Sequence, residues 1–312
     1  MSTKHLLAED LQSIADLVPE IDFTADMLPR FRQAQARNIK LEDQAKYEVE
    51  RREILIKVID QPDVRGLLYV PQSTSGTGYL HLHGGGYIIG APEGSDLRNL
   101  RLASELGVVI LSIDYRLAPE NPFPAPLDDC CAGLAWLHDN AAELGVDANR
   151  IAVGGESAGA GLAAALAIHM RGVGELAICH QHLTFPMLDN LTGNEDHPGD
   201  PLVGEFVWTR NNNQFAWQSY LGDQPAIAPQ VPARAQSFES LPQAWIYTVG
   251  QDLFRDENIL FAQNLMRAGV DVELVVYPGA CHGFQMVPNS RASKVYDRAH
   301  REGLAVGLGL QA

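Results

Sequence analysis

Residues 150–166 read RIAVGGESAGAGLAAAL, and this stretch predicts the fold more strongly than any other part of the chain. Its first five residues form a short apolar run typical of a buried strand, and the Ala-rich run that starts at Gly161 predicts a helix. Between the two, Gly155 and Gly159 flank Ser157. Glycines at these places allow a sharp turn with close packing, so the serine should stand above a sheet at a strand–turn–helix junction.

The same turn predicts a nucleophile. Gly-Glu-Ser-Ala-Gly (155–159) has the spacing of a nucleophile elbow, and Ser157 precedes a helix whose N-terminal dipole favours a developing negative charge. A Gly/Ser turn that only caps a helix is the competing interpretation, and the pentapeptide alone does not decide between the two. The flanking strand and helix favour the nucleophile.

Outward from this stretch, apolar strands alternate with amphipathic helices. The expected strands span 79–83, 107–113, 150–154, 178–185, 244–249 and 271–277, and the expected helices span 94–105, 126–143, 158–171, 256–268 and 291–306. This alternation predicts an α/β fold whose mostly parallel sheet is covered by helices on both faces. Strand-like runs at 47–50, 54–59 and 66–70 predict an antiparallel edge, and catalytic loops should lie at the carboxyl ends of the parallel strands.

Two segments interrupt the alternation. Residues 1–45 predict helices at 5–18 and 24–39, with Pro29 tolerated near the start of the second. Residues 187–222 are rich in Asn, Asp, Gly and Pro and then in aromatic residues, and an insertion of this length between strands is either functional or a lid. We therefore expect an N-terminal helical segment at 1–45 and a catalytic domain at 46–312 that contains the 187–222 insertion.

Composition excludes several classes of partner. The chain has 312 residues, with 23 Lys and Arg against 39 Asp and Glu, which gives a formal charge of −16. Such an acidic chain is not expected to bind nucleic acid or an anionic membrane surface. Neither a secretory leader nor a stretch of about 20 apolar residues is evident. The four cysteines have neither disulfide-framework nor metal-site spacing, so we expect reduced thiols and a cytoplasmic location.

A glycine loop follows the strand expected at 79–83. His83 precedes three consecutive glycines, 84–86, whose backbone N–H groups no side chain obstructs. Such a loop can aim donors at an oxyanion, and one such donor is worth roughly 3–4 kcal/mol of transition-state stabilisation. A tight turn is the competing interpretation. A phosphate loop is disfavoured because no Lys follows and no Gly-x-Gly-x-x-Gly is present.

A nucleophilic serine needs a base and a carboxylate that orients it, and in α/β-hydrolases these follow the serine in the order acid, then histidine. Asp252 and His282 each come just after an expected strand, downstream of Ser157. Asp256 and Glu257 compete with Asp252, although Asp256 better suits the N-terminus of the following helix. Other histidines near strand ends, which fit a packing role equally well, are His81, His83, His180 and His182.

Five motifs in register resemble the hormone-sensitive-lipase-like family of bacterial esterases, over residues 45 to the C-terminus: HGGGYIIG (83–90), DYRLAPENPFPA (114–125), GESAG (155–159), DLFRDE (252–257) and HGF (282–284). The resemblance implies an α/β-hydrolase fold with Ser157 as nucleophile, His282 as base and Asp252 as its orienting acid. It also implies an oxyanion hole from the N–H groups of Gly84, Gly85 and Ala158, and a loop-holding role for His83.

The resemblance further implies a helical cap made of the N-terminal segment and residues 187–222, a preference for small-molecule esters with short acyl chains, and a homodimer built on the last strand. No metal or organic cofactor is implied. The chain departs from the family at Glu156, where Asp or Thr is commoner, and at 253–254, where Pro-Leu is commoner. In the proline-rich motif, Arg116 and Glu120 could pair.

The sequence leaves other functions open. An amidase, a lactonase or a carbamate hydrolase would use the same three residues, and fold does not fix substrate. Some relatives of this fold are binding proteins that have lost the catalytic histidine, but this chain keeps Ser157, Asp252 and His282. A serine carboxylesterase that works through an acyl-enzyme is therefore the preferred hypothesis.

Overall fold

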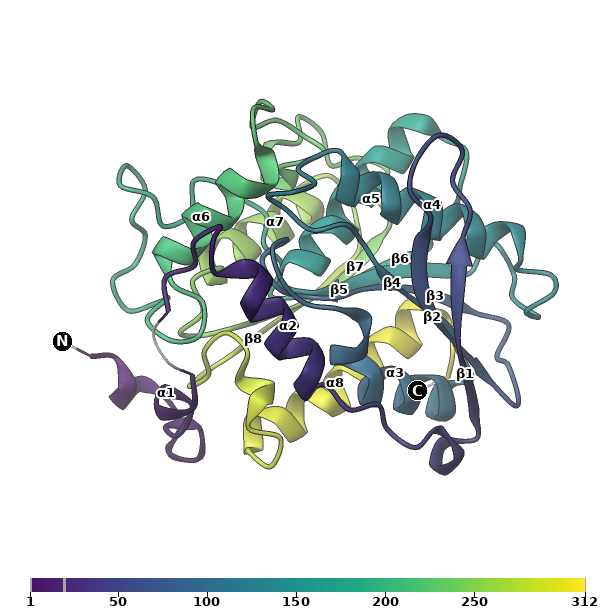
Figure 1. Ribbon diagram of the computed structural model, residues 1–312, viewed down its shortest axis with the longest axis horizontal. Helices are drawn as coiled ribbons and strands as arrows, with labels where there is room; N and C mark the ends of the chain where they lie inside the picture. The colour runs from purple at the N-terminus through teal and green to yellow at the C-terminus, as the bar shows by residue number, and fades with distance from the viewer. Residues whose placement is uncertain (1, 19–20, 312) are drawn as a thin grey trace.

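A single mixed sheet forms the centre of the computed structural model, which describes residues 2–18 and 21–311 (Figure 1). The strands run from one edge to the other in the order β1-β2-β4-β3-β5-β6-β7-β8. Their bounds are β1 Val49–Ile56, β2 Val64–Pro71, β3 Gly78–Leu82, β4 Val109–Asp114, β5 Ile151–Glu156, β6 His180–Thr184, β7 Gln243–Val249 and β8 Val272–Tyr277. Only the β1–β2 and β2–β4 pairs are antiparallel, which confirms a mostly parallel sheet with an antiparallel edge.

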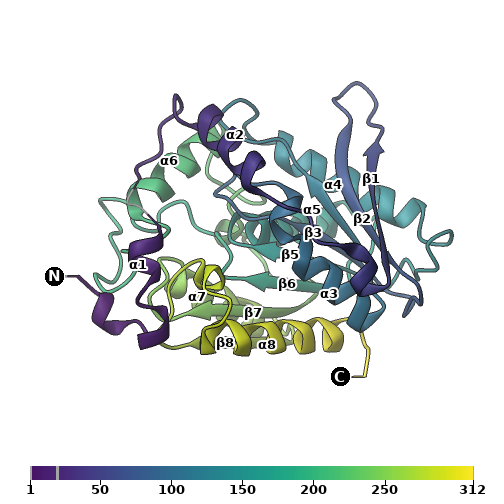
Figure 2. The same cartoon turned by 60° about the horizontal axis from the view of Figure 1, so that its bottom comes forward.

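Helices cover both faces of this sheet, as the sequence predicted (Figure 2). On one face, α3 (Asp96–Leu106) contacts β2 and β4, and α8 (Arg291–Gly307) contacts β6 and β7. On the other face, α4 (Ala125–Asp139), α5 (Ala158–Val173) and α7 (Arg255–Arg267) contact the strands beneath them. Every residue of β3, β5 and β6 is consequently buried, including the polar residues of β6, His180, Gln181, His182 and Thr184.

The antiparallel edge differs in detail from the expectation. Residues 47–50 and 54–59 do not form two strands but contribute to one strand, β1, which pairs with β2 from Val49↔Pro71 to Ile56↔Val64. At the opposite edge, β8 pairs with β7 and with no other strand of the described residues, and Val276 is 43% exposed. The expected homodimer on this strand stays a prediction, which light scattering of the purified chain tests.

The prediction of a helix at residues 5–18 is wrong. The chain there forms 3-10 turns at Lys4–Leu6 and Glu9–Leu11 and a single α-helical turn, α1, at Ile14–Leu17. Ala8 is not helical, with a ψ of 144°, and its N–H donates to the Gly279 carbonyl at 2.8 Å, so a tertiary hydrogen bond replaces a helical one. Leu11 and Ile14 are still buried, which accounts for the apolar spacing that suggested a helix. Further 3-10 turns lie at Gln44–Tyr47, Pro92–Ser95, Pro232–Arg234 and Phe284–Met286.

The two segments that interrupt the alternation lie against each other. The second helix expected near the N-terminus is α2 (Leu28–Asn38), and the insertion carries α6 (Arg210–Leu221), which lies beside it in both views (Figures 1 and 2). The N–H of Phe23 donates to Asn212 Oδ1 at 2.8 Å, and Asn212 Nδ2 donates to the Ile21 carbonyl at 2.8 Å. Segments almost 190 residues apart are thus joined by a reciprocal pair of hydrogen bonds.

The prediction that Arg116 and Glu120 of the proline-rich motif pair with each other is also wrong. Arg116 binds the buried carboxylate of Asp129 on α4 at 2.7 Å, because α4 packs directly beneath the motif. Glu120 instead receives two hydrogen bonds from Arg32 on α2, at 3.0 and 2.9 Å, and Arg32 also donates to the carbonyls of Ile88 and Ala118. The motif therefore anchors α2 to the sheet domain.

Two expectations from composition can be compared with the structure. All four cysteines, Cys130, Cys131, Cys179 and Cys281, are free, as predicted. Across residues 2–18 and 21–311, no helix combines the length and the apolar character that a membrane crossing requires.

Candidate active site

The turn between β5 and α5 holds Ser157 in a strained conformation, with φ 56° and ψ −120°. A non-glycine residue in such a region costs about 1–3 kcal/mol and persists only where its surroundings hold it. Here the Ser157 N–H donates to the Thr184 carbonyl at 2.9 Å, and its carbonyl accepts from the Met187 N–H at 3.1 Å. A Cβ on Gly155 or on Gly159 would collide with the Leu82 carbonyl, so only glycines permit this close approach to β3.

Three side chains from the carboxyl ends of β5, β7 and β8 meet above the sheet. His282 Nε2 lies 3.0 Å from Ser157 Oγ, and His282 Nδ1 lies 2.7 Å from Asp252 Oδ2. Because a carboxylate accepts only, Nδ1–H is the donor, which leaves the lone pair of Nε2 facing the serine hydroxyl. Asp252 is fully buried and also accepts from the Phe254 N–H at 2.9 Å, so its orientation is fixed.

The two competing carboxylates point elsewhere. Asp256 lies in the first turn of α7 and binds Arg255 at 2.7 Å on the surface. Glu257 is buried under the insertion, where it accepts from the Leu188 N–H at 2.7 Å and from the Thr192 hydroxyl. Burial raises the pKa of Glu257 well above its ordinary value, because few charged groups compensate for the lost water. Of the three candidates, only Asp252 contacts His282.

Unused backbone donors lie next to the serine. Gly84 sits so close that a Cβ there would lie 3.6 Å from Ser157 Cβ. Within residues 2–18 and 21–311, the N–H groups of Gly84, Gly85 and Ala158 have no protein acceptor. Free N–H groups beside a nucleophile and a helix N-terminus can receive an oxyanion that forms on an attacked carbonyl.

The arrangement of sheet, elbow and hydrogen-bonded side chains is that of one known fold family, whose sequence pattern matches residues 79–286. The chain belongs to the α/β-hydrolase fold family. The resemblance to hormone-sensitive-lipase-like esterases is thereby confirmed.

Several proteins that are similar to this α/β-hydrolase are esterases by name. Esterase LipI of Mycobacterium tuberculosis is 34% identical over 211 residues, which are 66% of this chain and 64% of LipI, so the match spans just under two thirds of that relative. An arylesterase of Saccharolobus solfataricus is 30% identical over 77% of this chain and 79% of its own. The solved structure of a bacterial heroin esterase is 33% identical, with a TM-score of 0.90 over 98% of this chain and 99% of that one.

In this α/β-hydrolase, His83 holds the glycine loop through a hydrogen bond to the backbone. His83 Nδ1 lies 2.8 Å from the Gly84 carbonyl, and the ring stacks on Tyr115 at 4.1 Å. Burial lowers the pKa of His83 to about 4, so the ring is neutral near pH 7 and donates through Nδ1. The other histidines near strand ends, His81, His180 and His182, are buried among strands and helices and do not contact Ser157.

A buried ion pair lies directly beneath the elbow, and sequence reasoning did not find it. Glu156 binds Arg98 from α3 and lies 3.2 Å from His81 Nε2. Burial alone would raise the pKa of Glu156, but the guanidinium of Arg98 outweighs it, and the pKa falls well below its ordinary value. The acidic residue before the serine is visible in the sequence as a departure from the family. Nothing in the sequence linked it to a helix residue 58 positions away.

Three aromatic residues of the insertion pack in two different places. Trp217 and Tyr220 on α6 are buried against Tyr87, whose ring stacks on that of Tyr220 at 4.0 Å. Trp208 instead packs on the backbone of Gly86, and its ring centroid lies 6.3 Å from that of His282. Trp208 therefore flanks the site beside the glycine loop, whereas the other two pack the insertion against Tyr87.

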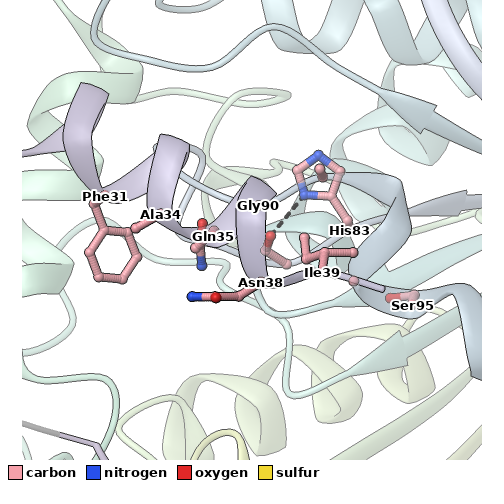
Figure 3. Close-up of a pocket in the computed structure, with 11 residues that line it drawn as sticks. Phe31, Ala34, Gln35, Asn38, Ile39, His83, Gly90 and Ser95 are labelled. Atoms are coloured by element: carbon pink, nitrogen blue, oxygen red, sulfur yellow. Dashed lines mark hydrogen bonds between the residues drawn. The ribbon is translucent and has the colours of Figure 1, made fainter. Parts of the chain in front are cut away.

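A cavity of about 550 Å³ lies between α2 and the loop that follows β3 (Figure 3). Phe31, Gln35 and Asn38 of α2 line one side, and His83 and Gly84 line the other. This volume lies within the range of small-molecule sites.

Among the described residues, no group of three or more His, Cys, Asp or Glu side chains could hold a metal ion.

Proposed function

We propose that the chain is a serine carboxylesterase that hydrolyses esters with short acyl chains through an acyl-enzyme intermediate. The observation that carries this proposal is the continuous line of hydrogen bonds from Ser157 Oγ through His282 to Asp252, at 3.0 and 2.7 Å. The esterase names of the similar proteins support the same reaction.

In the proposed acylation step, His282 Nε2 takes the proton of Ser157 as Oγ attacks the ester carbonyl carbon. The carbonyl π electrons move to its oxygen, and the N–H groups of Gly84, Gly85 and Ala158 stabilise that negative charge. The carbon–oxygen bond to the alcohol then breaks, and His282 returns the proton to the departing oxygen. Asp252 keeps Nδ1 protonated and stabilises the imidazolium that forms between the two transfers.

In the proposed deacylation step, a water molecule takes the place of the alcohol. His282 removes a proton from the water, whose oxygen attacks the acyl carbon, and the same three N–H groups hold the second oxyanion. Collapse of this intermediate breaks the bond to Ser157 Oγ, which recovers its proton from His282. The products are a carboxylic acid and the free enzyme.

Residues 1–45 and 187–222 are proposed to form a cap over this site. The hydrogen bonds between Phe23 and Asn212 and the anchoring of α2 by Arg32 support one continuous layer. Trp208 supports the short acyl preference, because its indole packs on Gly86 and bounds the space beside His282, with the two ring centroids 6.3 Å apart.

Initial rates on p-nitrophenyl esters from acetate to palmitate test the proposal, with Ser157→Ala as the matched variant. We expect rapid turnover of the shortest esters by the natural chain and a loss of about 10³-fold or more in the variant. Turnover that survives in Ser157→Ala would contradict the assigned nucleophile. If the natural chain turned over no ester at all, the esterase assignment would fail, and anilides, lactones and carbamates would be assayed next.

A further inference from the structure

A cleft between α3 and α8 gathers positive charge on a chain whose formal charge is −16. The cleft has a volume of about 480 Å³, which lies within the range of small-molecule sites. Its walls carry cationic side chains from both helices: Arg98, Arg101, Lys294, Arg298 and Arg301. Neither Ser157 nor His282 lines this cleft, which adjoins the cavity beside α2 at Gly94 and Ser95.

The positive charge is only partly balanced by neighbouring acids. Arg301 pairs with Glu105 at 2.9 Å and with Glu302 at 4.0 Å, and Arg98 pairs with the buried Glu156. In the part of the chain that the structure describes, Arg101, Lys294 and Arg298 have no ion pair. The one further carboxylate in the lining is Asp297, so three cations face a single acid. His300 adds no charge, because burial lowers its pKa to about 3.

The inner end of the cleft is rigid. Arg98 lies over the ring of Tyr296 at 5.5 Å and donates one hydrogen bond to Glu156, which together fix the plane of the guanidinium. A guanidinium carries five N–H groups, and the Arg98 side chain is still 24% exposed, so donors remain available on the cleft side. A fixed, partly buried arginine below exposed surface cations is suited to an oxyanion group, which arginine binds through paired hydrogen bonds.

We propose that this cleft binds a small polyvalent anion, of the class of phosphorylated small molecules, at a site distinct from that of the ester. Arg98 would contact the anion at the inner end, and Arg101 from α3 and Lys294 from α8 would contact it from the two walls. A single carboxylate would not use all three cations, whereas a phosphate or diphosphate group presents several oxygens to them.

Isothermal titration calorimetry of the full chain with inorganic pyrophosphate tests this proposal, with ionic strength held constant by sodium chloride. The test variant is Arg101→Gln/Lys294→Gln, and the matched control, Lys46→Gln/Arg267→Gln, removes the same charge at exposed positions outside the cleft. We expect saturable binding at one site, weakened about tenfold or more in the test variant, because each charged hydrogen bond contributes at least that factor. The control should bind as the natural chain does.

Circular dichroism and turnover of p-nitrophenyl acetate verify that both variants are folded, since neither pair belongs to the proposed active site. The proposal would be overturned if the natural chain gave no saturable heat with pyrophosphate. It would equally be overturned if the test and control variants lost the same affinity, because binding would then follow net charge rather than the cleft.

Discussion

Replacing Arg98 by methionine is expected to destabilise the fold by about 3 kcal/mol, because Glu156 would stay buried without its cation. The side chains of Arg98 and Glu156 are 24% and 11% exposed, so the pair is largely shielded from water. Removal of one partner from a buried pair costs about 3–5 kcal/mol, and the lower end applies here because water reaches Arg98 and His81 still contacts the carboxylate at 3.2 Å.

The double variant Arg98→Met/Glu156→Gln separates the buried charge from lost packing. Replacement of both partners is often nearly neutral, so we expect the double variant to recover most of the loss, to within about 1 kcal/mol of the natural chain. Urea unfolding at pH 7, followed by circular dichroism, measures the differences between the three proteins.

The pH dependence gives a second measurement of the same effect. The pKa of Glu156 in the folded chain lies below its ordinary value of 4.5, so its ion pair contributes stability above pH 4.5 and loses that contribution as the pH falls toward the folded pKa. Without Arg98 the pKa of Glu156 should rise, and protonation then relieves the unpaired charge. The stability gap between the natural chain and Arg98→Met should therefore narrow from pH 7 to pH 4. A constant gap, or equal losses in the single and double variants, would refute this reasoning.

Three further changes probe the site and its cover. Asp252→Asn should lower kcat for p-nitrophenyl acetate about 10⁴-fold with KM little changed, because the amide no longer holds Nδ1 as the donor; a loss below tenfold would contradict that role. Gly86→Ala should lower both activity and Tm, because φ is +60° there and the new methyl collides with Trp208; Gly86→Ala/Trp208→Ala should recover part of the Tm, and no recovery would argue against the collision. Arg32→Ala should speed tryptic cleavage within residues 21–45, seen by mass spectrometry, because α2 loses its bonds to Glu120 and to two carbonyls; unchanged cleavage would show that other contacts hold α2.

Local sequence was sufficient for the parallel strands and the helices that cover them, because each of these elements carries its own signal, whereas the edge strand β1 was expected as two strands. The run around Ser157 requires glycines where the backbone passes the Leu82 carbonyl, and that requirement is visible in the chain itself. The alternation of apolar strands and amphipathic helices likewise reflects burial on both faces of a parallel sheet. The N-terminal residues lack such a signal, since an apolar spacing typical of a helix is satisfied there by turns that a hydrogen bond from Ala8 to Gly279 holds in place.

What the sequence by itself determined was the alternation of the parallel strands with their covering helices and the three residues that follow strand ends, Ser157, Asp252 and His282. The tertiary structure decided which charges meet, because ion pairs such as those of Arg98 with Glu156 and of Arg32 with Glu120 join residues 58 and 88 positions apart. A local pattern reports the burial of each element, but the meeting of two charges depends on how helices pack across the sheet. That packing is a property of the whole fold, and no single stretch of the chain contains it.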